Sequence, residues 1–85
     1  MKLFFTRSFG RDYNRLPPRI QKHIDTQLIR LLENPKHPSL GTKKIKGTAS
    51  IWEGRVTREY RFTFQIQGDA YIIRRVGTHD ILKTP

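Results

Sequence analysis

A stripe of apolar residues with helical spacing is the strongest periodic pattern in the chain. Its successive members are four, four, three and one positions apart, and they are Ile20, Ile24, Leu28, Leu31 and Leu32. An α-helix completes a turn about every 3.6 residues, so this spacing predicts one apolar face packed against a core. The solvent side should carry Gln21, Lys22, Asp25, Gln27 and Arg30. Prolines at 17 and 18 suit the first turn of this helix, and Asn-Pro at 34 and 35 ends it.

Shorter apolar runs predict four β-strands, at residues 2–6, 50–56, 60–66 and 70–76. A Gln-Gly-Asp turn at 67–69 joins the last two as a hairpin. Ser8 is a candidate cap for a short helix over 9–16, and the lysine-rich segment 35–50 is predicted to be a loop. The order predicts a two-layer α+β fold, in which the N-terminal strand and two helices pack on a small antiparallel sheet.

Strand parity predicts which side chains face the helices, because alternate residues of a strand point to opposite faces. The core face should carry Tyr60, Phe62, Phe64 and Ile66, with Trp52 and Val56 beside them. The opposite face, predicted to be uncovered, then carries Glu53, Arg55 and Arg61. The last strand is apolar on both faces, which favours a central position against the N-terminal strand.

Length and composition limit the classes of protein to which the chain can belong. Its 85 residues predict a single domain, 1–85, with one small core. It has no cysteine, so neither disulfides nor thiolate-bound zinc can hold it together. No apolar run approaches the roughly 20 residues of a membrane span. Arginines soon follow the short apolar patch near the start, without a small-residue cleavage site, so we expect a cytoplasmic protein without a signal peptide.

The charge balance indicates a polyanionic partner. Seventeen lysines and arginines face seven acidic residues, for a formal net charge of +10. This exceeds the charge of roughly 2–8 that keeps a small domain soluble. It favours binding to nucleic acid or to an acidic protein. A solvated basic surface without a ligand is the alternative that charge alone leaves open.

Three side chains on or near the uncovered face suit the cleavage of RNA. The planar guanidinium groups of Arg55 and Arg61 match a phosphate and stay charged at any working pH. His79 follows the last strand, and histidine, with an unperturbed pKa of about 6.5, accepts or donates protons near neutrality. RNA brings its own nucleophile, the 2′-hydroxyl, so such a site requires neither metal nor cofactor. Taken singly, the same residues also fit a binding surface, with His79 solvated and Glu53 paired to an arginine.

The closing segments of the sequence resemble a known family. The pattern W-x-x-R-V-x-x-x-Y-R-F-x-F from Trp52 to Phe64, the order of elements and VGTHD at 76–80 resemble the RelE/ParE superfamily of bacterial toxins. The resemblance covers essentially the whole chain and implies a RelE-like βααβββ fold. For the ribonuclease branch it implies an mRNA endoribonuclease that inhibits translation, often in the ribosomal A site, and an acidic antitoxin partner. The alternatives are the ParE branch, which poisons DNA gyrase, and a non-catalytic module that binds nucleic acid or antitoxin.

The resemblance assigns roles to particular residues. Arg61 matches the arginine that binds the scissile phosphate, and Arg55 matches a neighbouring basic residue that helps to bind substrate. His79 falls where members have a catalytic arginine or histidine. The expected RNA-binding set is Lys43, Lys44, Lys46 and Arg58.

Two features depart from the pattern of the superfamily. Glu53 stands where some members have a second basic residue, and the closing ILKTP lacks the aromatic residue that others use. The acid–base roles therefore stay open. Either Glu53 or Asp80 is the base with His79 as acid, or Asp80 only orients His79.

Overall fold

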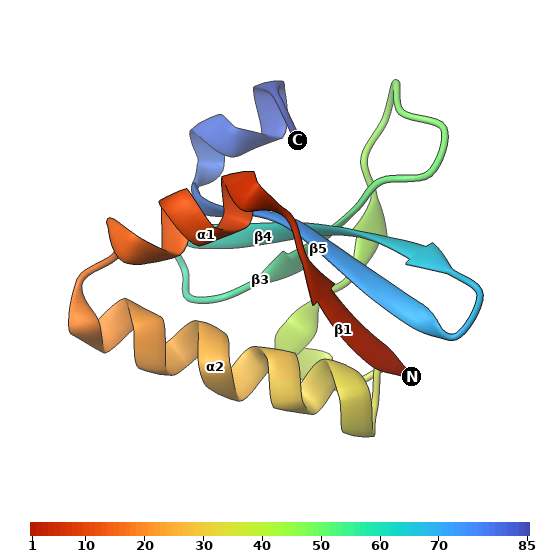
Figure 1. The fold of residues 1–85 in the computed structure, drawn as a ribbon, viewed down its shortest axis with the longest axis horizontal. Helices are drawn as coiled ribbons and strands as arrows, with labels where there is room; N and C mark the ends of the chain where they lie inside the picture. Colours follow the sequence, from red (N-terminus) through yellow and green to blue (C-terminus); the bar gives the residue numbers. More distant parts are fainter.

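The computed structural model describes residues 1–85 and contains a five-stranded mixed sheet with two α-helices (Figure 1). The elements are β1 (Lys2–Phe5), α1 (Arg7–Asn14), α2 (Pro18–Glu33), the 3₁₀ turn η1 (Pro38–Leu40), β2 (Lys43–Lys44), β3 (Trp52–Arg55), β4 (Tyr60–Gln67), β5 (Ala70–Thr78) and the 3₁₀ helix η2 (His79–Lys83). The α+β fold and the four predicted strands are confirmed. No helix is both long and apolar enough to cross a membrane.

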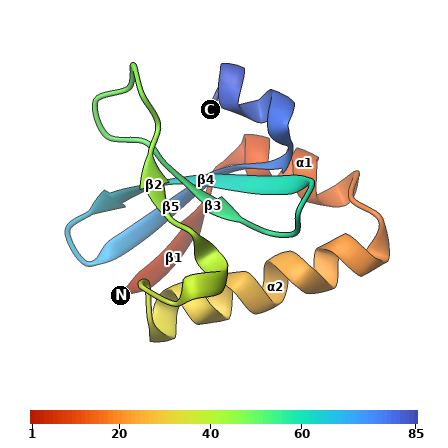
Figure 2. The ribbon, with the colours of Figure 1, turned by 180° about the vertical axis from the view of Figure 1, so that it is seen from behind.

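The strands are ordered β1-β5-β4-β3-β2, so β5 lies between the N-terminal strand and the meander. β1 runs parallel to β5, whereas the other neighbours are antiparallel. The central position predicted for the last strand, against the N-terminal strand, is therefore confirmed. The fifth strand, β2, lies within the segment that was predicted to be a loop, where two lysines pair with the start of β3 (Figure 2).

Helix α2 packs its apolar stripe against one face of the sheet, which we call the core face (Figure 2). The buried residues of this stripe are Ile20, Ile24, Leu28 and Leu31. They contact a cluster that includes Phe62 and Phe64 of β4, as parity predicted. Ile66 was also predicted for the core but is 49% exposed. It lies near the end of β4, in the hairpin that extends beyond α2 (Figure 1).

Two positions of α2 differ from the prediction. Leu32 is 39% exposed, whereas Gln27, predicted to face solvent, is 4% exposed. At about 100° per residue, position 27 falls within the buried arc, whereas position 32 lies about 120° from position 20. Gln27 is tolerated there because its Nε2 donates hydrogen bonds to the carbonyls of Arg55, at 2.7 Å, and Ser39, at 3.2 Å.

Helix α1 begins two residues earlier than predicted, because Thr6 rather than Ser8 caps it. Thr6 Oγ1 accepts a hydrogen bond from the N–H of Phe9 at 3.1 Å and donates one to the carbonyl of Arg74 at 2.6 Å. The helix therefore lies along the part of β5 that extends beyond β1. There Asp12 Oδ2 accepts a hydrogen bond from the N–H of Val76 at 3.2 Å, so a carboxylate takes the place of a neighbouring strand.

The C-terminal segment, η2 with Thr84 and Pro85, folds back over the second face of the sheet, which we call the open face (Figure 1). A Cβ atom added to Gly77 would lie 2.8 Å from Cγ2 of Ile81, so the absence of a side chain at Gly77 leaves the space in which η2 packs. The main-chain oxygen of Pro85 accepts a hydrogen bond from Thr63 Oγ1 at 3.1 Å. The expectation of an uncovered face is therefore wrong at its centre, where Thr63 is fully buried.

Candidate functional site on the open face

Three adjacent strands bring the predicted cationic residues into one row. Arg55 of β3 lies directly opposite Arg61 of β4, and Arg61 lies opposite Gly77 of β5. The Cβ atoms of directly opposite residues are about 4.5–5.5 Å apart, so the two arginines belong to one site. His79 follows Gly77 by two residues, at the start of η2 and at the same end of the sheet.

The side chain of Arg61 is held by the turn between β3 and β4. Its Nη1 donates to three carbonyls, those of Thr57 at 2.7 Å, Tyr60 at 3.0 Å and Arg58 at 3.1 Å. No carboxylate pairs with it, so neutral acceptors fix its position while its positive charge stays uncompensated. Such a group is preorganised to bind an anion.

The side chain of Arg55 is exposed beside the chain that leaves η1. A Cβ atom on Gly41 would lie 3.8 Å from Nη2 of Arg55, so the guanidinium rests against this glycine. The main-chain oxygen of Arg55 accepts the hydrogen bond from Gln27 described above. Helix α2 thus fixes the end of β3 from the core side, while the arginine points to solvent.

His79 and Asp80 are both exposed where β5 ends, and neither side chain makes a hydrogen bond or an ion pair within the chain. In particular, Asp80 does not hold the imidazole of His79. Both ring nitrogens of His79 are therefore available for a hydrogen bond to a ligand.

Glu53 has a different environment from the other candidate residues. It lies opposite Thr63, is 8% exposed, and forms no ion pair with Arg55 or Arg61. The pairing considered from sequence is therefore absent. No group of three or more histidine and acidic side chains comes together in the structure.

The four residues predicted to bind RNA backbone separate into two groups. Lys43 lies opposite Glu53 on the open face, and Lys46 and Arg58 are exposed in the turns that flank β3. Lys44 lies opposite Trp52, and its Nζ is 5.8 Å from the centre of the indole ring, a cation–π distance. Because Trp52 packs against the core cluster, Lys44 belongs to the core side of the sheet edge.

Sequence reasoning overlooked two consecutive arginines of β5, Arg74 and Arg75. Arg75 forms an ion pair with Asp12, with Nη2 and Oδ1 2.9 Å apart, and the hydrogen bonds that it donates to Asp12 raise the pKa of its guanidinium. Arg74 donates to Gln65 and to the main-chain oxygen of Pro85. The sequence did contain a signal for these two residues, namely a pair of positive charges inside an otherwise apolar strand.

Comparison with known proteins identifies related sequences and structures. No family model matches the sequence. Toxin RelE3 of Methanocaldococcus jannaschii is 34% identical over 79 residues, which cover 89% of this chain and 88% of that protein. The YoeB/ParE toxin from Agrobacterium tumefaciens has a TM-score of 0.79 at 26% identity, covering 93% of this chain and 99% of the other.

Two further solved structures share the fold. A chain of the RelB-RelE antitoxin-toxin complex from Methanococcus jannaschii has a TM-score of 0.73 at 26% identity, with 94% of each chain covered. YafQ from E. coli has a TM-score of 0.80 at 13% identity, covering 95% of this chain and 96% of the other. The agreement in sequence and in fold extends over nearly the whole of each chain, and the protein therefore belongs to the RelE family of toxins.

Proposed function

We propose that this toxin is an endoribonuclease that cuts mRNA by metal-independent acid–base chemistry and so inhibits translation in the cytoplasm. The observation that carries the proposal is the row formed by Arg55, Arg61 and Gly77 on adjacent strands, with His79 at its end. Two arginines without acidic partners and a free imidazole are the groups that cleavage at a phosphodiester requires.

The proposed reaction uses the 2′-hydroxyl of the RNA as nucleophile. A base takes its proton, the 2′-oxygen bonds to phosphorus, and the bond to the 5′-oxygen breaks as an acid protonates that leaving group. The product is a 2′,3′-cyclic phosphate, which water can open to a 3′-phosphate. Arg61 stabilises the charge on the phosphate oxygens, a contribution of about 10²–10³ in rate for one such donor. His79 is one of the two proton-transfer groups.

The second proton-transfer group is a carboxylate at the same end of the sheet. Asp80 is exposed next to His79, whereas Glu53 is buried beside Thr63. An RNA strand that reaches His79 therefore meets Asp80 first. We assign Asp80 the role of second group and keep Glu53, which is 8% exposed, as the alternative.

We further propose an acidic antitoxin as the protein partner. A net charge of +10 favours a partner of opposite charge, and the 26%-identical chain described above comes from a RelB-RelE antitoxin-toxin complex. The expected sign is copurification with a small acidic protein. Association should slow steeply as salt is added, and an association rate independent of salt would contradict this proposal.

Cleavage on ribosomes programmed with a defined mRNA tests the proposed function directly. Cut ends are mapped by primer extension, with and without the toxin, and in parallel without ribosomes. New ends that need active toxin are expected. Intact mRNA together with inhibited DNA gyrase would instead support the ParE-type activity.

A further inference from the structure

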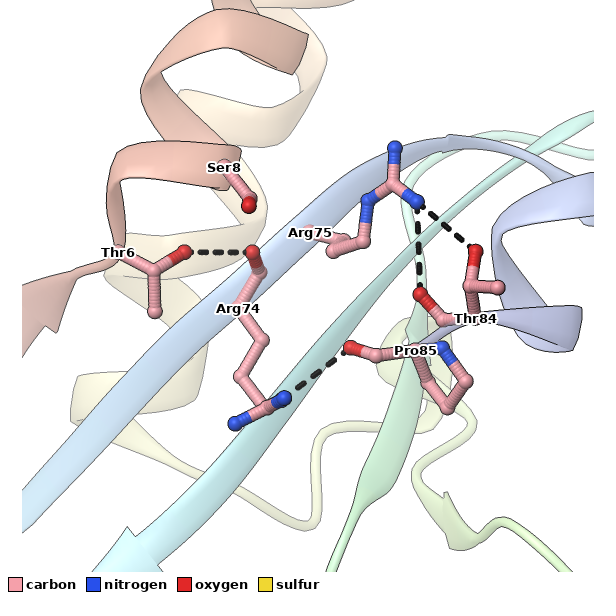
Figure 3. Close-up of a pocket in the computed structure, with 6 residues that line it drawn as sticks. All are labelled: Thr6, Ser8, Arg74, Arg75, Thr84 and Pro85. Atoms are coloured by element: carbon pink, nitrogen blue, oxygen red, sulfur yellow. Dashed lines mark hydrogen bonds between the residues drawn. The ribbon is translucent and has the colours of Figure 1, made fainter.

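A polar cavity lies on the open face, away from the row of Arg55 and Arg61. It measures about 200 Å³ and lies between the start of α1, strand β5 and the C-terminal segment (Figure 3). No hydrophobic and no acidic residue lines it, and its six lining residues are Thr6, Ser8, Arg74, Arg75, Thr84 and Pro85. A small cavity with this lining suits an anion.

A β-bulge explains how two consecutive arginines line the same cavity. Thr63 of β4 lies opposite Arg75, but the next residue, Phe64, lies opposite Ile73. Arg74 is therefore an extra residue in β5. Consecutive strand residues normally point to opposite faces, and a bulge redirects a side chain and interrupts this alternation.

The two arginines differ in their partners. Arg75 forms an ion pair with Asp12 and also donates to Thr84 Oγ1 at 3.1 Å. Arg74 donates to Gln65 Oε1 at 2.8 Å. It also donates to an oxygen of Pro85 at 3.2 Å (Figure 3). Its Nη2 has no partner within the chain, so one oriented guanidinium nitrogen remains for a ligand.

Hydroxyl groups complete the lining of the cavity. Ser8 Oγ accepts a hydrogen bond from Arg11 at 3.3 Å, so its own proton is free, and its side chain points from α1 toward β5 (Figure 3). Thr84 Oγ1 accepts from Arg75 and likewise keeps its proton. Phosphate groups of nucleic acids are commonly bound by this combination of arginine and hydroxyl donors.

An exposed aromatic residue on the same face favours nucleic acid as the source of the anion. Phe4 of β1 is 53% exposed and lies opposite Ile72, two residues before Arg74. Tyr71 and Ile73, the neighbours of Ile72, are buried in the core, so Ile72 and Phe4 belong to the open face. An exposed ring beside a phosphate site provides a surface on which a base can stack.

We infer that the Arg74–Ser8 cavity binds a non-scissile phosphate of the same RNA strand that is cut beside Arg61. This inference rests on the proposed function. Arg74 and Gly77, the residue opposite Arg61, are three positions apart on β5, or about 10 Å at 3.3 Å per residue. The cavity therefore holds the strand to one side of the cleavage point and sets its direction across the sheet.

Binding of a short single-stranded RNA with 2′-O-methyl riboses tests this inference, because the blocked nucleophile prevents cleavage. Arg74→Gln should weaken binding roughly tenfold. It should also reduce the slope of log affinity against log salt by about 0.7, the value for one phosphate contact to a single strand. The matched control, Arg19→Gln, removes the same charge from the exposed start of α2 and should change neither quantity.

A neutral methylphosphonate, moved stepwise along the RNA, identifies the phosphate concerned. At one position beside the cleavage point it should weaken binding to the wild-type protein but not to Arg74→Gln. Thermal unfolding shows whether Arg74→Gln is folded. Ser8→Ala repeats the test without touching the bonds of Arg74, with a loss of roughly threefold.

The outcomes separate this inference from the proposed function. If Arg74→Gln and Ser8→Ala bind RNA as Arg19→Gln does while Arg61→Gln binds weakly, the second phosphate site is wrong and the proposed function stands. If the wild-type protein binds no RNA, this inference is overturned, while cleavage on ribosomes still decides the proposed function. If Arg61→Gln has no effect on binding, the role of Arg61 in both is overturned.

Discussion

Asp12 of α1 holds Arg75 of β5 through two hydrogen bonds, with Nη2 2.9 Å from Oδ1 and Nε 3.0 Å from Oδ2. The same carboxylate accepts the N–H of Val76 at 3.2 Å. One side chain therefore closes the unpaired edge of β5 and neutralises an arginine of the open face.

Removing this carboxylate should destabilise the fold. Asp12→Ala leaves Arg75 without its partner and the buried N–H of Val76 without an acceptor. Because both side chains are only partly exposed, we expect a loss of about 2–4 kcal/mol in the free energy of unfolding, measured in urea. Asp69→Ala is the control, since its ion pair with Lys2 is exposed and 3.8 Å long, and it should cost less than about 0.5 kcal/mol. Equal losses for the two variants would contradict this account.

Arg61→Ala should abolish most of the proposed activity and preserve the fold. Its side chain lies on the open face, and its hydrogen bonds go to carbonyls of an exposed turn. We expect the transition state to lose about 2–4 kcal/mol in single-turnover cleavage, as for an oxyanion donor. Phe62→Ala, at a fully buried position, should instead unfold the domain or cost about 3–5 kcal/mol in stability. An Arg61→Ala protein that cuts at the wild-type rate would rule out the role of Arg61.

His79→Gln tests proton transfer. Glutamine keeps a hydrogen bond but cannot exchange a proton, so the rate should fall by about 10²–10⁴. His23→Gln, on the exposed side of α2, should leave the rate unchanged. If His79→Gln retained the wild-type rate, His79 would be a surface residue without a catalytic role.

Gly77→Ala and Gly10→Ala should have opposite effects on stability. A Cβ on Gly77 would lie 2.8 Å from Ile81, so η2 must shift, at a cost of about 1–3 kcal/mol. Its release should appear as faster amide hydrogen exchange in residues 79–83. Gly10 lies in α1 with no atom within 4 Å of an added Cβ, and alanine there should stabilise by about 0.5–1 kcal/mol. Slow exchange of η2 in Gly77→Ala would show that the glycine is not needed for this packing.

The pair formed by Tyr13 and Asp25 predicts a change of stability at alkaline pH. The phenol donates to Asp25 at 3.0 Å, and burial, this hydrogen bond and the carboxylate charge raise the pKa of Tyr13 above 10.0. A raised pKa in the folded state stabilises the protein fully below the unfolded value of 10.0. The stabilisation is lost as the pH rises through the folded value.

Ultraviolet titration of tyrosinate measures the pKa of Tyr13 on which this change of stability depends. Tyr13→Phe should remove the component that ionises above pH 10.0, and Asp25→Asn should shift it down toward that value. An unchanged titration in Asp25→Asn would show that the carboxylate has no influence on the phenol.

Local periodicity in the sequence determined the helices, four of the strands and the faces of β3 and β4. Ile20, Ile24 and Phe62 are buried as their spacing requires, and Arg55 and Arg61 share a face because alternation in a strand depends only on neighbouring residues. The prediction failed where the polarity of a residue disagreed with its angular position on the helix, as at the buried Gln27 and the exposed Leu32.

The tertiary structure alone decided which distant segments meet on the open face. Asp12 and Arg75 are 63 positions apart, and no periodic pattern connects them. The bulge that brings Arg74 and Arg75 into one cavity interrupts the alternation on which the sequence reading relied. The burial of Thr63 depends on how η2 packs over Gly77. These contacts are set by the packing of whole elements, whereas a sequence pattern reports only the residues near each position.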